Sequence, residues 1–242
     1  MQEEDVVKIE QGNGWTEIVI NRPERRNAII PPVSDAIRAA LEAAEQDAGV
    51  ASVILRGEGG FFCSGVDLKA LQADPPPPWR NRQGDSWRQL HLALFRFPKP
   101  VIGAFEKYGI NAGSALAMAC DILIAGESAF LQVGEIQQGA SAPMNFAWFR
   151  IKATEQVMAR LALYGDRVAA PELSRLGLVA ECIADDQVVT RCREIATRLA
   201  AFPAGATVAI KRGIIEQRGI TDPESYFRQS RSNALLNAGM VS

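Results

Sequence analysis

The stretch Ile110–Asp121, "INAGSALAMACD", follows the apolar run "PVIGAF" and reads as a strand that gives way to a helix. The junction between them contains only very small residues, namely Ala112, Gly113, Ser114 and Ala115. Small residues at such a junction indicate that another group comes close to the backbone there. The first turn of a helix also carries unpaired N–H groups and a partial positive charge. The stretch therefore predicts either a tight packing contact or a place that holds a negatively charged oxygen.

A second turn of the same kind occurs earlier in the chain. The segment "FFCSGVDLKAL" follows the strand-like run "SVILRG" and continues as a helix. If the two turns lie side by side, the amides of Val66 and Ala112 can donate to one carbonyl oxygen from two directions. Such an oxyanion hole is typically worth about 3–4 kcal/mol of transition-state stabilisation per donor. From these residues alone, tight helix–strand packing remains an equal alternative.

The remainder of the chain alternates strand and helix patterns. A hairpin is predicted over residues 5–23, and a recurring strand–strand–helix unit with a spacing of about 45–50 residues follows. Four consecutive prolines in "ADPPPPWRNRQGDSW" predict an exposed loop before a helix at 86–95. From about residue 187 the pattern is helical. These features favour an α/β fold of stacked repeats with an appended helical piece.

The composition excludes several classes of function. The 242 residues are 48% hydrophobic and 22% charged, with a net charge of −2, which is ordinary for a soluble protein and gives no nucleic-acid footprint. No segment is long and apolar enough for a membrane span, and the N-terminal "MQEEDVVKIE" lacks the apolar core of a secretory signal, so we expect a cytoplasmic protein. Four irregularly spaced cysteines are expected to be reduced and mostly buried. The single histidine, His91, excludes a multi-histidine metal site, and we expect it to be partly exposed on its helix.

Five segments together resemble the crotonase superfamily, the enoyl-CoA hydratase/isomerase group. They are "NRPERRNAI", "FCSGVDLKAL", "KPVIGAF", "ACDILIAGESAFLQVGEI" and "ALYGDRVAAPELSRLGLVAECI". The resemblance extends from about Val6 to Phe227 in the family's order. It implies an α/β fold in which a crotonase-like spiral of ββα repeats, residues 1–186, is followed by a C-terminal helical trimerisation region, residues 187–242.

The resemblance also implies an acyl-CoA enzyme that stabilises a thioester enolate. Val66 and Ala112 match the two oxyanion-hole positions. No metal is expected, and no cofactor apart from the coenzyme A that is part of the acyl-CoA thioester. A homotrimer or a dimer of trimers is implied. The residues that match coenzyme A or substrate contacts are Arg25, Arg26, Ser64, Asp67, Leu68 and Lys69.

One departure from the family pattern affects the predicted reaction. Hydratases of the family carry two glutamates, but Ala115 stands where the first belongs, and only Glu135 in "FLQVGEI" matches the second. Water addition uses both a base and an acid, whereas one carboxylate suffices to move a proton from C2 to C4 across a dienolate. A lone glutamate in an apolar pocket should have a raised pKa, which suits a group that takes and returns a proton. We therefore expect double-bond isomerisation of an enoyl-CoA, or another enolate reaction that uses a single base, rather than ordinary hydration.

Two alternatives remain open. The protein is a hydratase, another lyase or a hydrolase if a second polar group comes from elsewhere, such as Glu106, Asp74 or Gln132. It is a catalytically silent acyl-CoA-binding subunit if the lost acid has abolished the chemistry. A bulkier pocket floor is also expected, because "SAPMNFAWF" replaces a Gly-Gly pair and Phe146, Trp148 and Phe149 are placed to line or plug the pocket. Asp121 and Cys63 are expected to be structural, the latter as a packed thiol.

Overall fold

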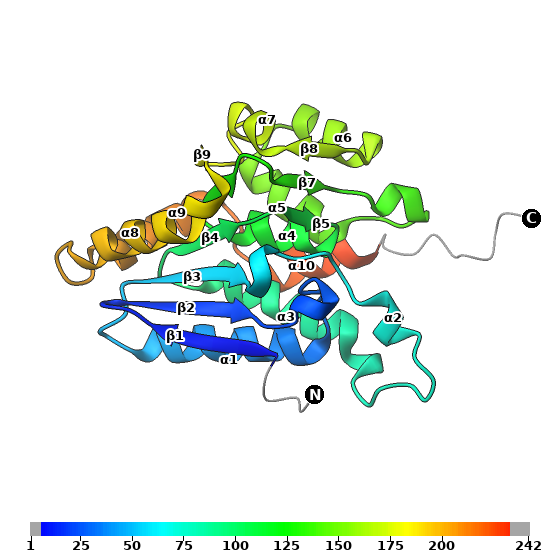
Figure 1. Cartoon of the computed structure of the whole chain (residues 1–242), viewed down its shortest axis with the longest axis horizontal. Coiled ribbons are helices and arrows are strands. Elements are labelled where there is room, and N and C mark those ends of the chain that lie inside the picture. The colour runs from blue at the N-terminus through cyan, green and yellow to red at the C-terminus, as the bar shows by residue number, and fades with distance from the viewer. Residues whose placement is uncertain (1–5, 233–242) are drawn as a thin grey trace, which may run out of the picture.

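The computed structural model describes the backbone of residues 6–232 and the side chains of residues 6–228 (Figure 1). The strands are β1 (Val7–Gln11), β2 (Trp15–Ile20), β3 (Ser52–Gly57), β4 (Val101–Phe105), β5 (Tyr108–Ile110), β6 (Ile122–Gly126), β7 (Phe130–Gln132), β8 (Arg167–Ala169) and β9 (Glu181–Ile183). The helices are α1 (Pro31–Gln46), α2 (Leu68–Leu71), α3 (Gln83–Arg96), α4 (Ala112–Ala119), α5 (Pro143–Lys152), α6 (Glu155–Tyr164), α7 (Ala170–Arg175), α8 (Val188–Ala200), α9 (Ala206–Gln217) and α10 (Pro223–Ser232). Among them, no helix is long and apolar enough to cross a membrane.

A six-stranded sheet forms the centre of the molecule, with the strand order β1-β2-β3-β4-β6-β9. The predicted hairpin is confirmed, because β1 and β2 pair antiparallel. All later neighbours in this sheet pair in parallel, as the strand–helix–strand pattern requires. In Figure 1 the helix α1 lies at the bottom of the view beside β1 and β2, and α8 and α9 lie on the left.

Both faces of the parallel part of the sheet are buried. Successive side chains of a strand point to opposite faces, so β3 places Val53 and Leu55 in the main hydrophobic core and Ile54 in a second, smaller cluster. The smaller cluster is completed by residues of α8, including Val188 and Cys192. Parallel strands covered on both faces read as continuous apolar runs, which explains why "SVILRG" and "PVIGAF" lack polar alternation.

A second sheet, β5-β7-β8, gives the fold its spiral character. The chain leaves the large sheet at the end of β4 or β6, adds β5 or β7 to the small sheet, and then forms α4 or α5. β5 and β7 pair in parallel, and a parallel bridge between Cys63 and Gly109 adds the preceding turn to the same stack. The expected stack of strand–strand–helix repeats is therefore confirmed, although its spacing is uneven: β3 and β4 begin at Ser52 and Val101, but β6 begins already at Ile122.

The helices after residue 187 differ in how much of their surface is buried against the rest of the protein. α8 packs against β3, β4 and β6, so it belongs to the packing of the large sheet. On α9, only Lys211 is buried. The boundary between residues 186 and 187 stays a prediction, and residues 1–5 and 233–242 lie outside the described part of the chain.

The prediction for His91 was wrong. Its side chain is completely buried, because α3 packs against α1 on one side and α10 on another. Nδ1 of His91 accepts a hydrogen bond of 2.8 Å from Nε1 of Trp148, and burial lowers the pKa of His91 to about 3. His91 is thus a neutral core residue, while the helix pattern alone gave no sign that α10 returns to cover it.

Candidate active site

The two small-residue turns lie side by side. The Cys63 amide donates to the carbonyl of Tyr108 and the Ile110 amide donates to the carbonyl of Cys63, each at 3.1 Å. A β-carbon added to Gly113 would lie only 2.2 Å from the Cys63 oxygen. Close packing of the turns is therefore one real reason for the small residues. Cys63 is the packed thiol that was expected, since burial raises its pKa to about 12.

The same contact brings the two predicted oxyanion amides to one cavity. Val66 and Ala112 both line it, and neither backbone amide donates a hydrogen bond to any described residue. Gly65 has a positive φ of 102°, and a β-carbon on it would lie 2.9 Å from the oxygen of Ile110 and 3.8 Å from the nitrogen of Ala112. Glycine at this position lets the first turn approach the second within contact distance.

This active-site cavity has a volume of about 430 Å³ and is mainly apolar. Of the described residues that line it, Glu135 alone has an ionisable side chain. The lining residues are Ser64, Val66, Leu68, Gly84, Trp87, Ile110, Asn111, Ala112, Ala115, Glu135, Gln138, Ser141, Ala142, Pro143, Met144 and Asn145. An apolar cleft with a few converging polar groups and one carboxyl group is typical of a small-molecule reaction site.

Glu135 reaches the cavity from the neighbouring turn of the spiral. It begins a short 3-10 helix, residues 135–138, directly after β7 and Gly134. Burial raises the pKa of Glu135 to about 7, against the opposing effect of hydrogen bonds from its own backbone amide and from Asn145. Its Oε1 accepts from Nδ2 of Asn145 at 2.9 Å, whereas its Oε2 is enclosed and bonded to no described residue. A carboxyl group in this state can both accept and return a proton near neutral pH.

Ala115 also lines the cavity and is completely buried. A methyl group therefore occupies the wall where the resemblance places a second glutamate. Three residues were proposed to replace that glutamate, and none of them lines the cavity: Glu106, Asp74 and Gln132. Gln132 is instead engaged by its side chain, which donates to the carbonyl of Gly165 at 2.9 Å.

The predicted coenzyme A contacts separate into two groups. Ser64 and Leu68 line the active-site cavity together with Val66, Ala112 and Glu135. The remaining four, Arg25, Arg26, Asp67 and Lys69, do not line it.

Asp67 is occupied within the fold. Its carboxylate is 4% exposed and accepts from Arg22 at 3.0 Å, from Arg25 at 2.7 Å and 3.1 Å, and from the Ala70 amide at 2.9 Å. The last of these bonds caps the first turn of α2. Arg26 and Lys69 are exposed beside this network, so they remain accessible to a ligand outside the cavity.

The expected bulky floor of the pocket differs from the observed one. Trp148 and Phe149 are fully buried and Phe146 is partly buried, and none of them lines the cavity. They lie on α5, where Trp148 packs against the aromatic cluster of α3 and α10. The bulky walls are instead formed by Met144 of the same helix and Trp87 of α3. Helix phase, which the sequence did not reveal, decides which residues of α5 face the cavity.

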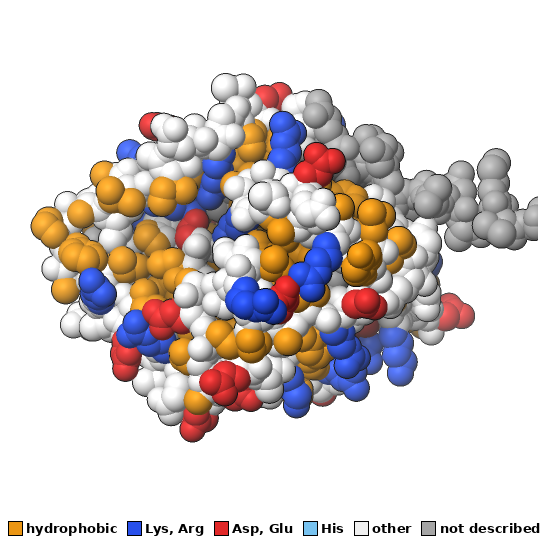
Figure 2. Space-filling view, turned by 90° about the horizontal axis from the view of Figure 1, so that it is seen from above, with side chains coloured by type: hydrophobic (Ala, Val, Ile, Leu, Met, Phe, Trp, Pro, Cys, Tyr) orange, Lys and Arg blue, Asp and Glu red, His pale blue; other side chains and the backbone are white. Residues whose placement is uncertain are grey.

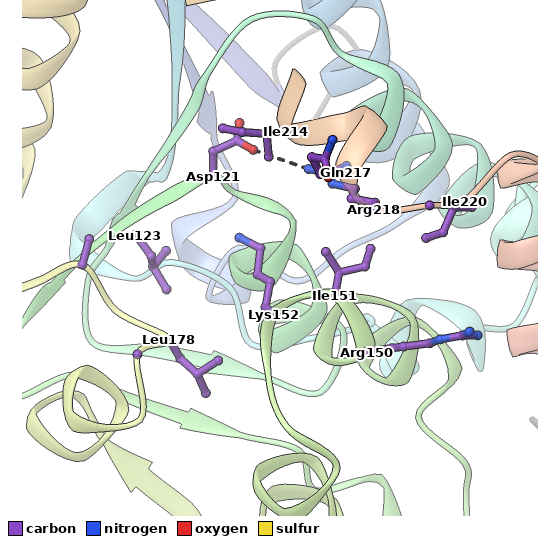
Figure 3. A pocket seen from close by; sticks show the side chains of 13 residues that line it. Asp121, Leu123, Arg150, Ile151, Lys152, Leu178, Ile214, Gln217, Arg218 and Ile220 are labelled. Atoms are coloured by element: carbon purple, nitrogen blue, oxygen red, sulfur yellow. Dashed lines mark ion pairs between the residues drawn. The ribbon is translucent and has the colours of Figure 1, made fainter. Parts of the chain in front are cut away.

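A larger cavity of about 680 Å³ lies elsewhere and contains none of the predicted site residues (Figure 3). Asp121, Lys152 and Arg218 line it. Asp121 accepts from the Val101 amide at 2.8 Å, forms an ion pair with Lys211 and lies 3.7 Å from Arg218. The structural role expected for Asp121 is confirmed, because its carboxylate ties β4 and β6 to α9.

Two residues near Glu135 were missed by the sequence reasoning. Asn111 immediately precedes Ala112, whose amide is predicted to belong to the oxyanion hole, and Asn145 contacts Glu135 from α5. Both side chains line the cavity. The available signals were the asparagine at a predicted helix start and the polar residue within the otherwise apolar segment "PMNFAWF".

The fold agrees with the comparisons to known proteins. A family model described as enoyl-CoA hydratase/isomerase matches residues 10–231. A probable enoyl-CoA hydratase, echA12, of Mycobacterium leprae is 31% identical over 226 residues, which cover 90% of this chain and 76% of that protein. A probable enoyl-CoA hydratase of Mycobacterium tuberculosis, EchA14, is 35% identical over 198 residues, covering 80% and 75% respectively. The chain belongs to the enoyl-CoA hydratase/isomerase family of the crotonase superfamily.

Solved structures support the same architecture. An enoyl-CoA hydratase from Polaromonas sp. JS666 superimposes with a TM-score of 0.80 at 27% identity, covering 93% of this chain and 88% of that one. An enoyl-CoA hydratase from Mycobacterium avium subsp. paratuberculosis K-10 reaches a TM-score of 0.84 at 24% identity, covering 95% and 92%, and shows the fold. The crotonase-like fold expected from the resemblance is thereby confirmed.

Proposed function

We propose that this acyl-CoA enzyme is an isomerase that moves the double bond of a 3-enoyl-CoA to the 2-position. The observation that supports this proposal is that Glu135 is the sole ionisable side chain among the described residues of the active-site cavity. One group that titrates near neutral pH suffices for a proton shuttle. It does not by itself provide the separate acid and base that water addition uses.

In the proposed reaction, Glu135 removes a proton from C2 of the substrate. The electrons of the C2–H bond form a dienolate, and the negative charge develops on the thioester oxygen between the amides of Val66 and Ala112. Glu135 then returns the proton to C4, which leaves the double bond between C2 and C3. A carboxyl group with a pKa of about 7 is accessible in both protonation states near neutral pH, so it can take the proton and return it.

Hydration is the second candidate, because the similar proteins named above are called enoyl-CoA hydratases. The side chains of Ser64, Gln138 and Ser141 line the cavity and can orient a water molecule, although they do not ionise in the required range. Separate incubation with crotonyl-CoA and with a 3-enoyl-CoA, followed by mass analysis of the products, distinguishes the two. A mass gain of one water from crotonyl-CoA would contradict the isomerase proposal.

The decisive variant is Glu135→Gln. It should lower turnover of a 3-enoyl-CoA by about 10³-fold or more, while the affinity for the coenzyme A thioester changes little. Glu106→Gln is the matched control, because Glu106 is also partly buried with a raised pKa, caused by burial, yet does not line the cavity. Unchanged activity in Glu135→Gln would remove this mechanism.

Exchange of the C2 hydrogen in heavy water tests enolate formation without knowledge of the natural acyl group. Exchange that depends on Glu135 supports an enzyme. Tight thioester binding without exchange would instead favour a catalytically silent acyl-CoA-binding subunit.

We further propose that the protein forms a homotrimer or a dimer of trimers through the surface of α9. Ile210 and Ile214 on this helix are 70% and 51% exposed, and Phe202 just before it is 48% exposed. They line an apolar groove of about 420 Å³, and hydrophobic side chains gather on this side of the molecule in Figure 2, at the left. Burial of such a patch against a second copy would be favourable.

Sedimentation velocity tests the assembly. Ile210→Glu should shift the protein towards monomers, whereas Leu163→Glu, a similarly exposed position on α6, should not. Assembly that persists in Ile210→Glu would place the interface elsewhere.

A cytoplasmic location remains a proposal as well. All four cysteines are free, as expected in a reducing compartment. Fractionation of cells that express the full chain would test it.

A further inference from the structure

Two asparagines connect the proposed base with the proposed oxyanion hole, and this inference rests on the proposed function. Asn145 of α5 is 1% exposed. Its Nδ2 donates to Oε1 of Glu135 at 2.9 Å and to the backbone carbonyl of Asn111 at 3.1 Å. The carbonyl of Asn111 belongs to the same peptide group as the N–H of Ala112.

The orientation of the Asn145 amide follows from these partners. A backbone carbonyl oxygen can only accept, so the Asn145 atom beside the Asn111 oxygen must be the NH₂ group. An NH₂ group has two hydrogens, and the second one is directed to the carboxylate of Glu135. Both hydrogens of one side chain are thus used by the two parts of the site.

Asn111 makes the reciprocal connection. Its Oδ1 accepts from the amide of Gly134, which precedes Glu135, at 2.8 Å, and its own amide donates to the carbonyl of Gln132 at 2.8 Å. Asn111 has φ 52° and ψ −109°, a backbone conformation that is costly for a residue with a side chain. Hydrogen bonds from both directions hold it in this conformation, which aims the next amide, that of Ala112.

We propose that Asn145 is a positioning residue that couples Glu135 to the oxyanion hole, with Asn111 as its backbone partner. By occupying Oε1, Asn145 leaves Oε2 as the oxygen that exchanges the proton. By donating to the carbonyl of Asn111, it polarises the peptide group and makes the N–H of Ala112 a stronger donor to the developing oxyanion. The contact to Oε1 persists in both protonation states, because a protonated carboxyl group still accepts at its carbonyl oxygen.

The first test measures the titration of Glu135 without any turnover. The ¹³C signal of the Glu135 carboxyl group is followed against pH in selectively labelled protein, with Glu135→Gln for assignment. Asn145→Ala removes a donor to the carboxylate, so the pKa of Glu135 should rise by about one unit. Asn145→Asp keeps the side-chain volume but replaces the donor with a second carboxyl group, so the rise should be larger.

The second test uses C2 exchange. In Asn145→Ala the exchange rate constant should fall roughly tenfold to 100-fold, its acid limb should move to higher pH with the titration, and KM should change less than kcat. Gln156→Ala, on α6 and outside the cavity, is the control. A residue with a merely structural role would lower thermal stability without moving the pH profile.

The outcomes separate this proposal from the proposed function. An unchanged Glu135 titration in folded Asn145→Ala and Asn145→Asp overturns the coupling, even where Glu135→Gln is inactive. A shifted titration in a protein that never exchanges C2 hydrogen supports the coupling and contradicts the proposed chemistry. Where the alanine variant fails to fold, the isosteric aspartate variant carries the decision.

Discussion

Two turns that border the active-site cavity each hold a carboxyl group, Asp67 in one and Glu135 in the other, and the fold treats the two groups in opposite ways. Asp67 accepts from Arg22, Arg25 and the Ala70 amide. Burial would raise the pKa of Asp67, but the hydrogen bonds from Arg25, Ala70 and Arg22 outweigh it and hold that pKa below its usual value. Glu135 has one side-chain donor, and burial raises its pKa to about 7.

The comparison shows how burial and partnering assign different roles to the same chemical group. A carboxylate paired with two guanidinium groups stays ionised and stabilises the native turn. A carboxyl group that lacks a cation is unstable as an anion and gains proton affinity. The paired carboxylate of Asp67 thus contributes to the stability of its turn, and the proposed function assigns the reactive role to Glu135.

The largest expected effect on stability comes from removing the Asp67 carboxylate from its ion pairs with Arg22 and Arg25. Asp67→Ala leaves the buried Arg22 without its anion and removes a helix cap, so the free energy of unfolding should fall by about 3–5 kcal/mol. Urea denaturation at pH 7 measures it. Asp166→Ala is the control, because Asp166 is exposed and forms no ion pair with any described residue. A loss below about 1 kcal/mol would show that the network is not structural.

Removing the carboxyl group of Glu135, which has no cationic partner among the described residues, should instead raise the free energy of unfolding. The pKa of Glu135 rises on folding from 4.5 to about 7, so the folded state binds the extra proton between these values and stability decreases as pH rises through that window. Glu135→Gln should therefore be more stable than the wild type at pH 8 by about 1–3 kcal/mol, and this gain should shrink towards pH 4.5. Thermal unfolding at several pH values measures the difference. A destabilised Gln variant at pH 8 would mean that contacts to the carboxylate, that from Asn145 included, outweigh the cost of its burial.

The smallest effect concerns the pH profile of the intact enzyme. The C2 exchange rate should rise about tenfold per unit below pH 7 and level off above it, because the proposed base is the carboxylate form of Glu135. Stopped assays across pH 5–9 at a saturating thioester concentration measure this rise of the exchange rate with pH. A limb near 4.5 would place the proton transfer on an ordinary exposed carboxyl group.

Much of this comparison could be predicted from local sequence. The small residues of both turns, the apolar strands before them and Glu135 after its strand all lie in short segments with a clear pattern. Local pattern indicated Val66 and Ala112 as site residues, the family resemblance added Ser64, Leu68 and Glu135, and all five line one cavity. Local pattern did not reveal the burial of His91, because that depends on α10, which lies far away in sequence.

By itself, the amino-acid sequence indicated most of the strands and helices, the family and the presence of a single matching glutamate, but not the short strands β5 and β8. Only the tertiary structure decided that Asp67 is paired within the fold, that Met144 rather than Trp148 faces the cavity, and that Asn145 bridges Glu135 and the Asn111 carbonyl. The physical reason is that periodicity reports which residues one element buries. Which charge or donor meets which partner depends on contacts between elements that are distant in the chain.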